Sequence, residues 1–128
     1  MLGLLQGKPI TVLGAAFKPG TDDVRESPAL ALANQLTKSG AIVTIHDPMV
    51  KNPKLEVGER FTNDLASAVK GSDLLIIATE WENYSQLDPK TLGNLVTTKN
   101  IIDGRGLLEV EDWVIAGWNL TKLGEAQA

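Results

Sequence analysis

The sequence predicts an α/β protein, built as a doubly wound, mainly parallel sheet with helices on both faces. Short apolar runs with strand character alternate along the chain with segments whose apolar residues recur at helical spacing, which is typical of parallel sheets. One run, Leu74 to Ala78, is apolar without alternation, as expected of a central strand covered on both faces. No internal repeat or low-complexity tract interrupts the pattern, so we expect a single domain over residues 1–128.

The elements are predicted from their end signals as well as from their periodicity. The first strand covers Ile10 to Leu13, and the first helix runs from Pro28, after the N-cap residue Ser27, to Ser39 before Gly40. Further strands are predicted over 41–46, 74–78, 100–103 and 118–123, with a short one near Arg60-Phe61. Further helices are predicted over 64–70 with Thr62 or Asn63 as cap, from Asp88-Pro89 with Leu92, Leu95 and Val96 inward, and around Val110, Trp113 and Val114.

Composition excludes several classes of protein. With 128 residues, 43% of them hydrophobic and 22% charged, the chain resembles an ordinary globular domain. Its net charge of -4 argues against nucleic acid as a partner, and no apolar run approaches the ~20 residues of a membrane span. Cysteine is absent, which rules out disulfides, thiolate metal sites and a cysteine nucleophile, and a single histidine, His46, leaves little for a metal centre. We therefore expect no metal, and a cytoplasmic protein by default.

The twelve residues from Phe17 to Pro28 are the most informative segment of the chain. They follow the first strand, and in open α/β sheets the loops at the carboxyl ends of strands bind ligands. Pro19-Gly20 suits a type II turn, and Lys18, directly before proline, is biased to an extended backbone. We therefore expect the ammonium group of Lys18 to extend outward from the edge of the sheet.

Four ordered motifs resemble a known family. They read AAFKPGTDDVRESPAL from Ala15, IHDP from Ile45, LLIIATEW from Leu74 and IIDGRG from Ile101. Together they are similar to the C-terminal, UDP-binding domain of the UDP-glucose/GDP-mannose dehydrogenase family, and the UDP-glucose 6-dehydrogenase branch matches best. The resemblance covers roughly Lys8 to Gly124, and four motifs in order are far more specific than one.

The resemblance implies a part of a larger enzyme. In the family, the whole enzyme oxidises the C6 alcohol of UDP-glucose to a carboxylate in two NAD-dependent steps, with NAD on an N-terminal Rossmann domain and a thioester on a cysteine outside this domain. Here the first strand ends in Gly14-Ala15-Ala16 and not in G-x-G-x-x-G, so a Rossmann-like sheet would bind a nucleotide by other means. We expect no cofactor on this chain, no catalysis by it alone, and partners in the missing NAD-binding and central domains.

The resemblance also assigns the candidate site residues. The family's Phe-Lys pair matching Phe17 and Lys18 contacts the nucleotide-sugar. Spacing alone would instead make Lys18 a solvated charge. Phe17 has two equal interpretations, a contact with the ligand or a core residue beneath the loop. The arginine matching Arg105 contacts the UDP portion, and flanking glycines let the backbone approach a ligand. The alternative for Arg105 is a surface arginine paired with Asp103. We predict that Lys18 and Arg105 converge on a crevice at the carboxyl edge of the sheet, with Phe17 at its base.

Arg25 has two interpretations. Asp22, Asp23 and Glu26 surround it in sequence, so a local ion-pair network can stiffen the loop, whereas the family's matching arginine reaches NAD on the N-terminal domain. Two neighbouring motifs favour structural roles: Trp81 as a lid or core edge, and Asp47 as part of an Asp-Pro turn instead of a ribose-binding acid.

Two alternative functions accompany this interpretation. The chain can be a stand-alone nucleotide-binding or interaction module without dehydrogenase activity, which inspection of the encoding reading frame for an upstream NAD domain would test. A small enzyme acting through Asp22 and Asp23 is disfavoured, because adjacent carboxylates make a poor acid/base pair unless a neighbour separates their pKa values.

Overall fold

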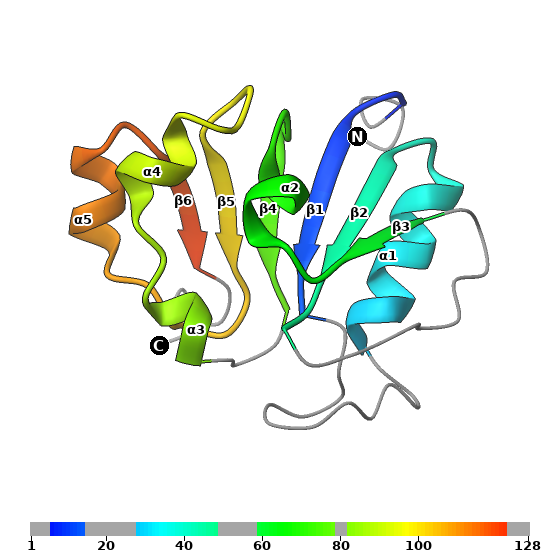
Figure 1. The fold of residues 1–128 in the computed structure, drawn as a ribbon, viewed down its shortest axis with the longest axis horizontal. Helices are drawn as coiled ribbons and strands as arrows, with labels where there is room; N and C mark the ends of the chain where they lie inside the picture. The colour runs from blue at the N-terminus through cyan, green and yellow to red at the C-terminus, as the bar shows by residue number, and fades with distance from the viewer. Residues whose placement is uncertain (1–5, 15–27, 49–58, 79–81, 123–128) are drawn as a thin grey trace.

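The computed structural model describes residues 6–14, 28–48, 59–78 and 82–122, and these form a six-stranded sheet with flanking helices (Figure 1). The strands are β1 (Pro9–Leu13), β2 (Ile42–His46), β3 (Arg60–Thr62), β4 (Leu74–Ile77), β5 (Asn100–Asp103) and β6 (Asn119–Lys122). The helices are α1 (Pro28–Lys38), α2 (Leu65–Val69), α3 (Glu82–Ser85), α4 (Pro89–Gly93) and α5 (Val110–Ile115).

The sheet confirms the predicted fold class. Its strands lie in the order β3-β2-β1-β4-β5-β6, and every neighbouring pair is parallel. The chain first builds outward from β1 to β2 and β3, and then returns to place β4 on the other side of β1 (Figure 1). The direction of winding therefore reverses between β1 and β4, which is the topological switch point of a doubly wound sheet.

Two apolar cores lie on the two faces of this sheet. On one face α1 packs against alternate residues of the central strands, and the cluster includes Ile10, Val12, Ala29, Ala33, Val43 and Ile45. On the other face α2, α3, α4 and α5 supply a second cluster that includes Leu13, Val69, Leu75, Ile77, Tyr84, Leu92 and Trp113. In Figure 1, α1 lies behind the sheet and α2 lies in front of it. Burial on both faces explains the continuous apolar sequence of β4.

Most predicted elements are confirmed, with small differences at their ends. The short strand predicted near Arg60-Phe61 is β3. The N-cap of α2 is Asp64, whose carboxylate accepts from the backbone N–H of Ser67 at 3.3 Å, so the prediction of Thr62 or Asn63 as the cap was wrong. The one-turn helix α3 was not predicted, since four residues are too few to show helical periodicity.

The apolar stripe predicted for α5 is also wrong in part. Trp113 is buried, but Val110 and Val114 are 38% and 55% exposed. The helix is short and lies beside the edge strand β6, at the outer end of the sheet (Figure 1), so only one of its side chains reaches deep into the core. The ring of Trp113 packs edge-on against that of Trp118, with centroids 4.9 Å apart.

No helix in the described part of the chain is long and apolar enough to cross a membrane.

Candidate functional site

The carboxyl ends of four neighbouring strands lie side by side at one edge of the sheet. The register aligns Leu13 of β1 with His46 of β2 and with Ile77 of β4, and aligns Ile77 with Asp103 of β5. The loops that follow these residues therefore leave the sheet at the same height. In Figure 1 this is the lower edge, toward which the strand arrows point. The switch point between β1 and β4 lies at its centre.

Three of the four predicted site residues, Phe17, Lys18 and Arg25, lie outside the described residues, as do Asp22, Asp23 and Trp81. What the structure describes is where their loop begins. Gly14 follows β1 with a φ of 108°, in the region that favours glycine, and its backbone N–H donates to the backbone carbonyl of His46 at 2.6 Å. The loop that carries Lys18 thus starts from a fixed point beside the end of β2.

Arg105 is described, and its side chain is exposed just beyond the carboxyl end of β5. The backbone of its turn is held at two points. The N–H of Gly104 donates to the carbonyl of Ile77 at 3.1 Å, and the N–H of Arg105 donates to Oδ1 of Asp103 at 3.1 Å. The strand between β1 and β5 is β4, so two strand spacings, about 10 Å, separate the starts of the Lys18 and Arg105 loops.

Sequence reasoning missed a buried polar network at the same edge, between His46 and Tyr84. The hydroxyl of Tyr84 lies 2.9 Å from Nδ1 of His46 and 3.1 Å from its backbone carbonyl. Nε2 of His46 lies 3.1 Å from the carbonyl of Asn63, which can only accept. Nε2 therefore carries the proton, and Nδ1 accepts from the hydroxyl of Tyr84. The signal in the sequence is slight: one tyrosine in the polar segment after β4.

Burial sets the charge state of this network. It lowers the pKa of His46 below the usual 6.5, with the carbonyl of Asn63 and the carboxylates of Asp47 and Asp64 acting weakly in the opposite direction. Burial, with a smaller effect of the nearby Asp47 charge, raises the pKa of the Tyr84 hydroxyl, which is therefore protonated at neutral pH and able to donate. The network joins β2, the segment before α2, and α3, and it supports the central part of the carboxyl edge.

Asp47, the alternative ribose-binding acid, is fully buried. Its backbone carbonyl accepts from the side-chain amide of Asn63 at 2.6 Å. Such burial agrees with the structural interpretation of the Asp-Pro turn. Within the described residues, no group of three or more histidine, aspartate or glutamate side chains is placed to hold a metal ion.

Comparisons with known proteins agree with this geometry. The chain is 33% identical over 127 residues to the UDP-glucose 6-dehydrogenase TuaD of Bacillus subtilis, covering 97% of this chain and 28% of that protein. A solved NDP-N-acetyl-D-galactosaminuronic acid dehydrogenase from Methanosarcina mazei superposes with a TM-score of 0.86 at 27% identity, over 94% of this chain and 25% of that one. A solved UDP-D-ManNAc dehydrogenase from Pyrococcus horikoshii gives 0.80 at 31% identity, over 97% and 27%.

The chain thus spans about a quarter of the length of these relatives. The model of the UDP binding domain of the UDP-glucose/GDP-mannose dehydrogenase family matches residues 11–110, a range that includes all four sequence motifs. This chain belongs to the UDP-glucose/GDP-mannose dehydrogenase family and corresponds to its UDP binding domain.

Proposed function

We propose that residues 1–128 form a single domain that binds UDP or a UDP-sugar at the carboxyl edge over β1, β4 and β5. Phe17, Lys18 and Arg105 are the proposed contacts. The supporting observation is the turn after β5, where hydrogen bonds from the backbone N–H groups of Gly104 and Arg105 fix the exposed Arg105 one strand away from the topological switch point. Ligands of doubly wound sheets bind at this place. Lysine and arginine side chains are long enough to reach one diphosphate from loops that start about 10 Å apart. The guanidinium fork suits a diphosphate.

The proposal extends to the role of the domain in a larger enzyme. The domain would supply one wall of the substrate site of an NAD-dependent UDP-glucose 6-dehydrogenase, with NAD-binding and central domains as its partners. The choice of glucose follows the names of curated relatives such as TuaD, whereas the two solved structures are named for other sugars. A cytoplasmic location completes the proposal, in keeping with a chain free of cysteine.

NAD itself fits this chain poorly. The backbone N–H of Gly14, at the turn where a dinucleotide fingerprint would begin, is already hydrogen-bonded to the carbonyl of His46. Ala16 stands in place of the second glycine of that fingerprint, the one that lets a pyrophosphate approach. Arg25 is the residue proposed to reach NAD held on another domain. The chain alone should therefore form no NADH from UDP-glucose and NAD, measured by absorbance with concentrated protein, and turnover that survives removal of contaminating enzymes would contradict the proposal.

Isothermal titration of UDP against three proteins tests the site. Wild type should bind with modest affinity, because one domain offers only one wall of an enclosed site. Lys18→Ala should bind more weakly. Arg105→Lys keeps the charge but loses the planar fork, which should cost on the order of 1–3 kcal/mol. Equal affinities of all three proteins for UDP would refute the site.

A further inference from the structure

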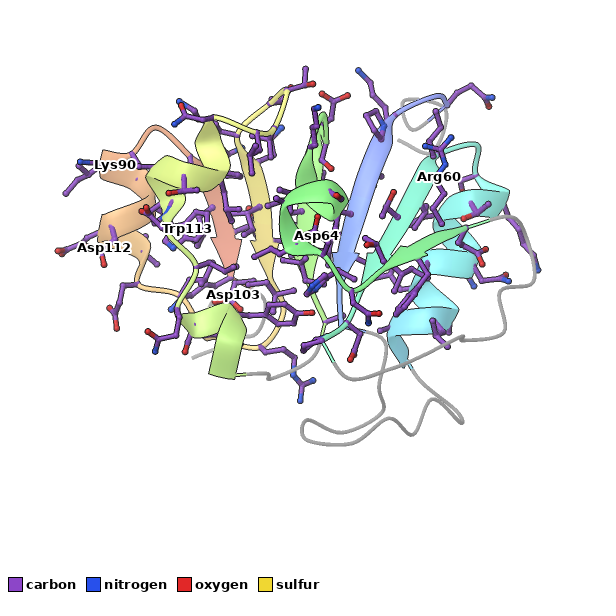
Figure 2. All side chains as sticks on the ribbon, in the orientation of Figure 1. Arg60, Asp64, Lys90, Asp103, Asp112 and Trp113 are labelled. Carbon is purple, nitrogen blue, oxygen red and sulfur yellow. The ribbon has the colours of Figure 1, made fainter. Side chains whose placement is uncertain are left out.

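Asp103, the last residue of β5, carries a carboxylate that is fully buried. Figure 2 labels it at the carboxyl end of the strand. Both of its oxygens accept backbone hydrogen bonds from the turn that follows: Oδ1 from the N–H of Arg105 at 3.1 Å, and Oδ2 from the N–H of Leu108 at 2.8 Å. Burying a carboxylate is costly unless such bonds replace its hydration. The two bonds show what the buried charge does in this structure: it folds residues 104–108.

The ends of this turn are fixed, and its middle is exposed. At one end Gly104 is bonded to the carbonyl of Ile77 in β4, and at the other end the side chain of Leu108 is buried in the second core. Between them Arg105 and Gly106 are exposed. Gly106 has a φ of 72°, which a residue with a side chain rarely adopts. The direction in which Arg105 leaves the backbone is therefore set by a turn that one carboxylate closes.

We propose that Asp103 is a positioning residue for the nucleotide site. Its carboxylate holds the backbone of Arg105 in the conformation in which the guanidinium group binds the diphosphate. This inference rests on the proposed UDP site and adds to it a residue that does not touch the ligand. A flexible turn would have to be ordered on binding, and that ordering weakens affinity. Because the carboxylate already orders the turn when the domain folds, this loss of affinity is avoided on binding. The alternative is that Asp103 stabilises the fold and has no effect on the ligand.

A double-mutant cycle separates these two roles. Asp103→Asn preserves the shape of the side chain but replaces one acceptor oxygen with an N–H donor, so one of the two turn bonds is lost. Arg105→Ala should weaken UDP roughly tenfold to a hundredfold, and Asp103→Asn should weaken it several-fold to about tenfold. If Asp103 acts through Arg105, the double variant should bind UDP no more weakly than Arg105→Ala alone, within about twofold. Losses that multiply would overturn the inference.

A ligand-free measurement accompanies the cycle. Hydrogen exchange of the Arg105 and Leu108 amides should be faster in Asp103→Asn, on the order of tenfold for the amide that loses its acceptor. The matched control is Asp73→Asn, the same chemical change in a carboxylate that accepts from the hydroxyl of Thr98 at the amino edge of the sheet. Asp73→Asn should leave UDP affinity within about twofold of wild type.

The outcomes are distinguishable. Absence of UDP binding by wild type, or equal UDP affinities of wild type and Arg105→Ala, would refute the proposed function and the inference with it. A normal loss in Arg105→Ala with wild-type affinity in Asp103→Asn would refute the inference alone. If Asp103→Asn does not fold, Gly106→Ala replaces it: a Cβ there meets nothing within 4 Å, while the positive φ strains the same turn. Its loss of UDP affinity should also vanish in an Arg105→Ala background, and persistence of that loss would contradict the inference.

Discussion

Removing the hydroxyl of Tyr84 tests the buried network beneath the carboxyl edge. In Tyr84→Phe the ring and its packing remain, and only the oxygen is lost. Tyr84 is 1% exposed and His46 is 5% exposed, so water cannot readily replace the missing donor. Nδ1 of His46 would be left without its partner at 2.9 Å, whereas the His46 carbonyl would keep its bond from Gly14.

The magnitude follows from this unequal loss. A buried acceptor that loses its donor costs about 1–3 kcal/mol, while the carbonyl, which still accepts one hydrogen bond, adds little. For a domain of this size each kcal/mol lowers Tm by roughly 3–5 °C. We therefore expect Tyr84→Phe to lower the free energy of unfolding by about 1–3 kcal/mol and Tm by roughly 3–15 °C.

Urea unfolding followed by circular dichroism measures the change, at a pH well above 7 so that His46 is neutral in both states. The control is Thr97→Val, which removes an exposed hydroxyl whose bond to the carbonyl of Gly71 is 3.1 Å long. That change should stay within about 0.5 kcal/mol. A Tyr84→Phe protein as stable as the control would show that the network does not stabilise the fold, and the reasoning from burial would fail.

Three further predictions concern pH, packing and the loop after β1. Burial depresses the pKa of the only histidine, His46, so its contribution to stability is present above pH 6.5 and is lost as pH falls toward the folded-state pKa. The free energy of unfolding should therefore decline as pH falls below about 6.5, and a flat profile in urea unfolding would contradict this. Ile45 is fully buried, so Ile45→Ala should lower the free energy of unfolding by about 2–5 kcal/mol. Val114 is 55% exposed, so Val114→Ala should lower it by about 0.5 kcal/mol or less. Similar losses in the two variants would mean that the buried and exposed faces are misassigned. Arg25→Ala should leave UDP affinity nearly intact in titration, and a loss equal to that of Lys18→Ala would instead assign Arg25 to the UDP site.

The sequence alone was sufficient for the fold class and for most of the elements. Apolar periodicity and end signals are local properties, so they predicted β4 as a central strand and α1 as a helix with one apolar stripe. The four motifs were sufficient to identify the family, because they occur in order along one chain. They also pointed to Arg105, which is exposed just beyond the end of β5 and whose role in binding stays a prediction.

Tertiary structure decided which of these residues meet. The periodicity of α5 could not show that its short helix covers a sheet edge, where Trp113 packs inward and Val114 remains exposed. Nothing local links His46 to Tyr84, since their bond joins residues 38 apart, one at the end of β2 and the other in α3. The sequence placed Asp103 two residues before Arg105, and only the fold shows that its buried carboxylate accepts from the backbone N–H groups of Arg105 and Leu108. A sequence states which groups are polar; the fold determines which of them are buried, and burial forces each one to find a partner.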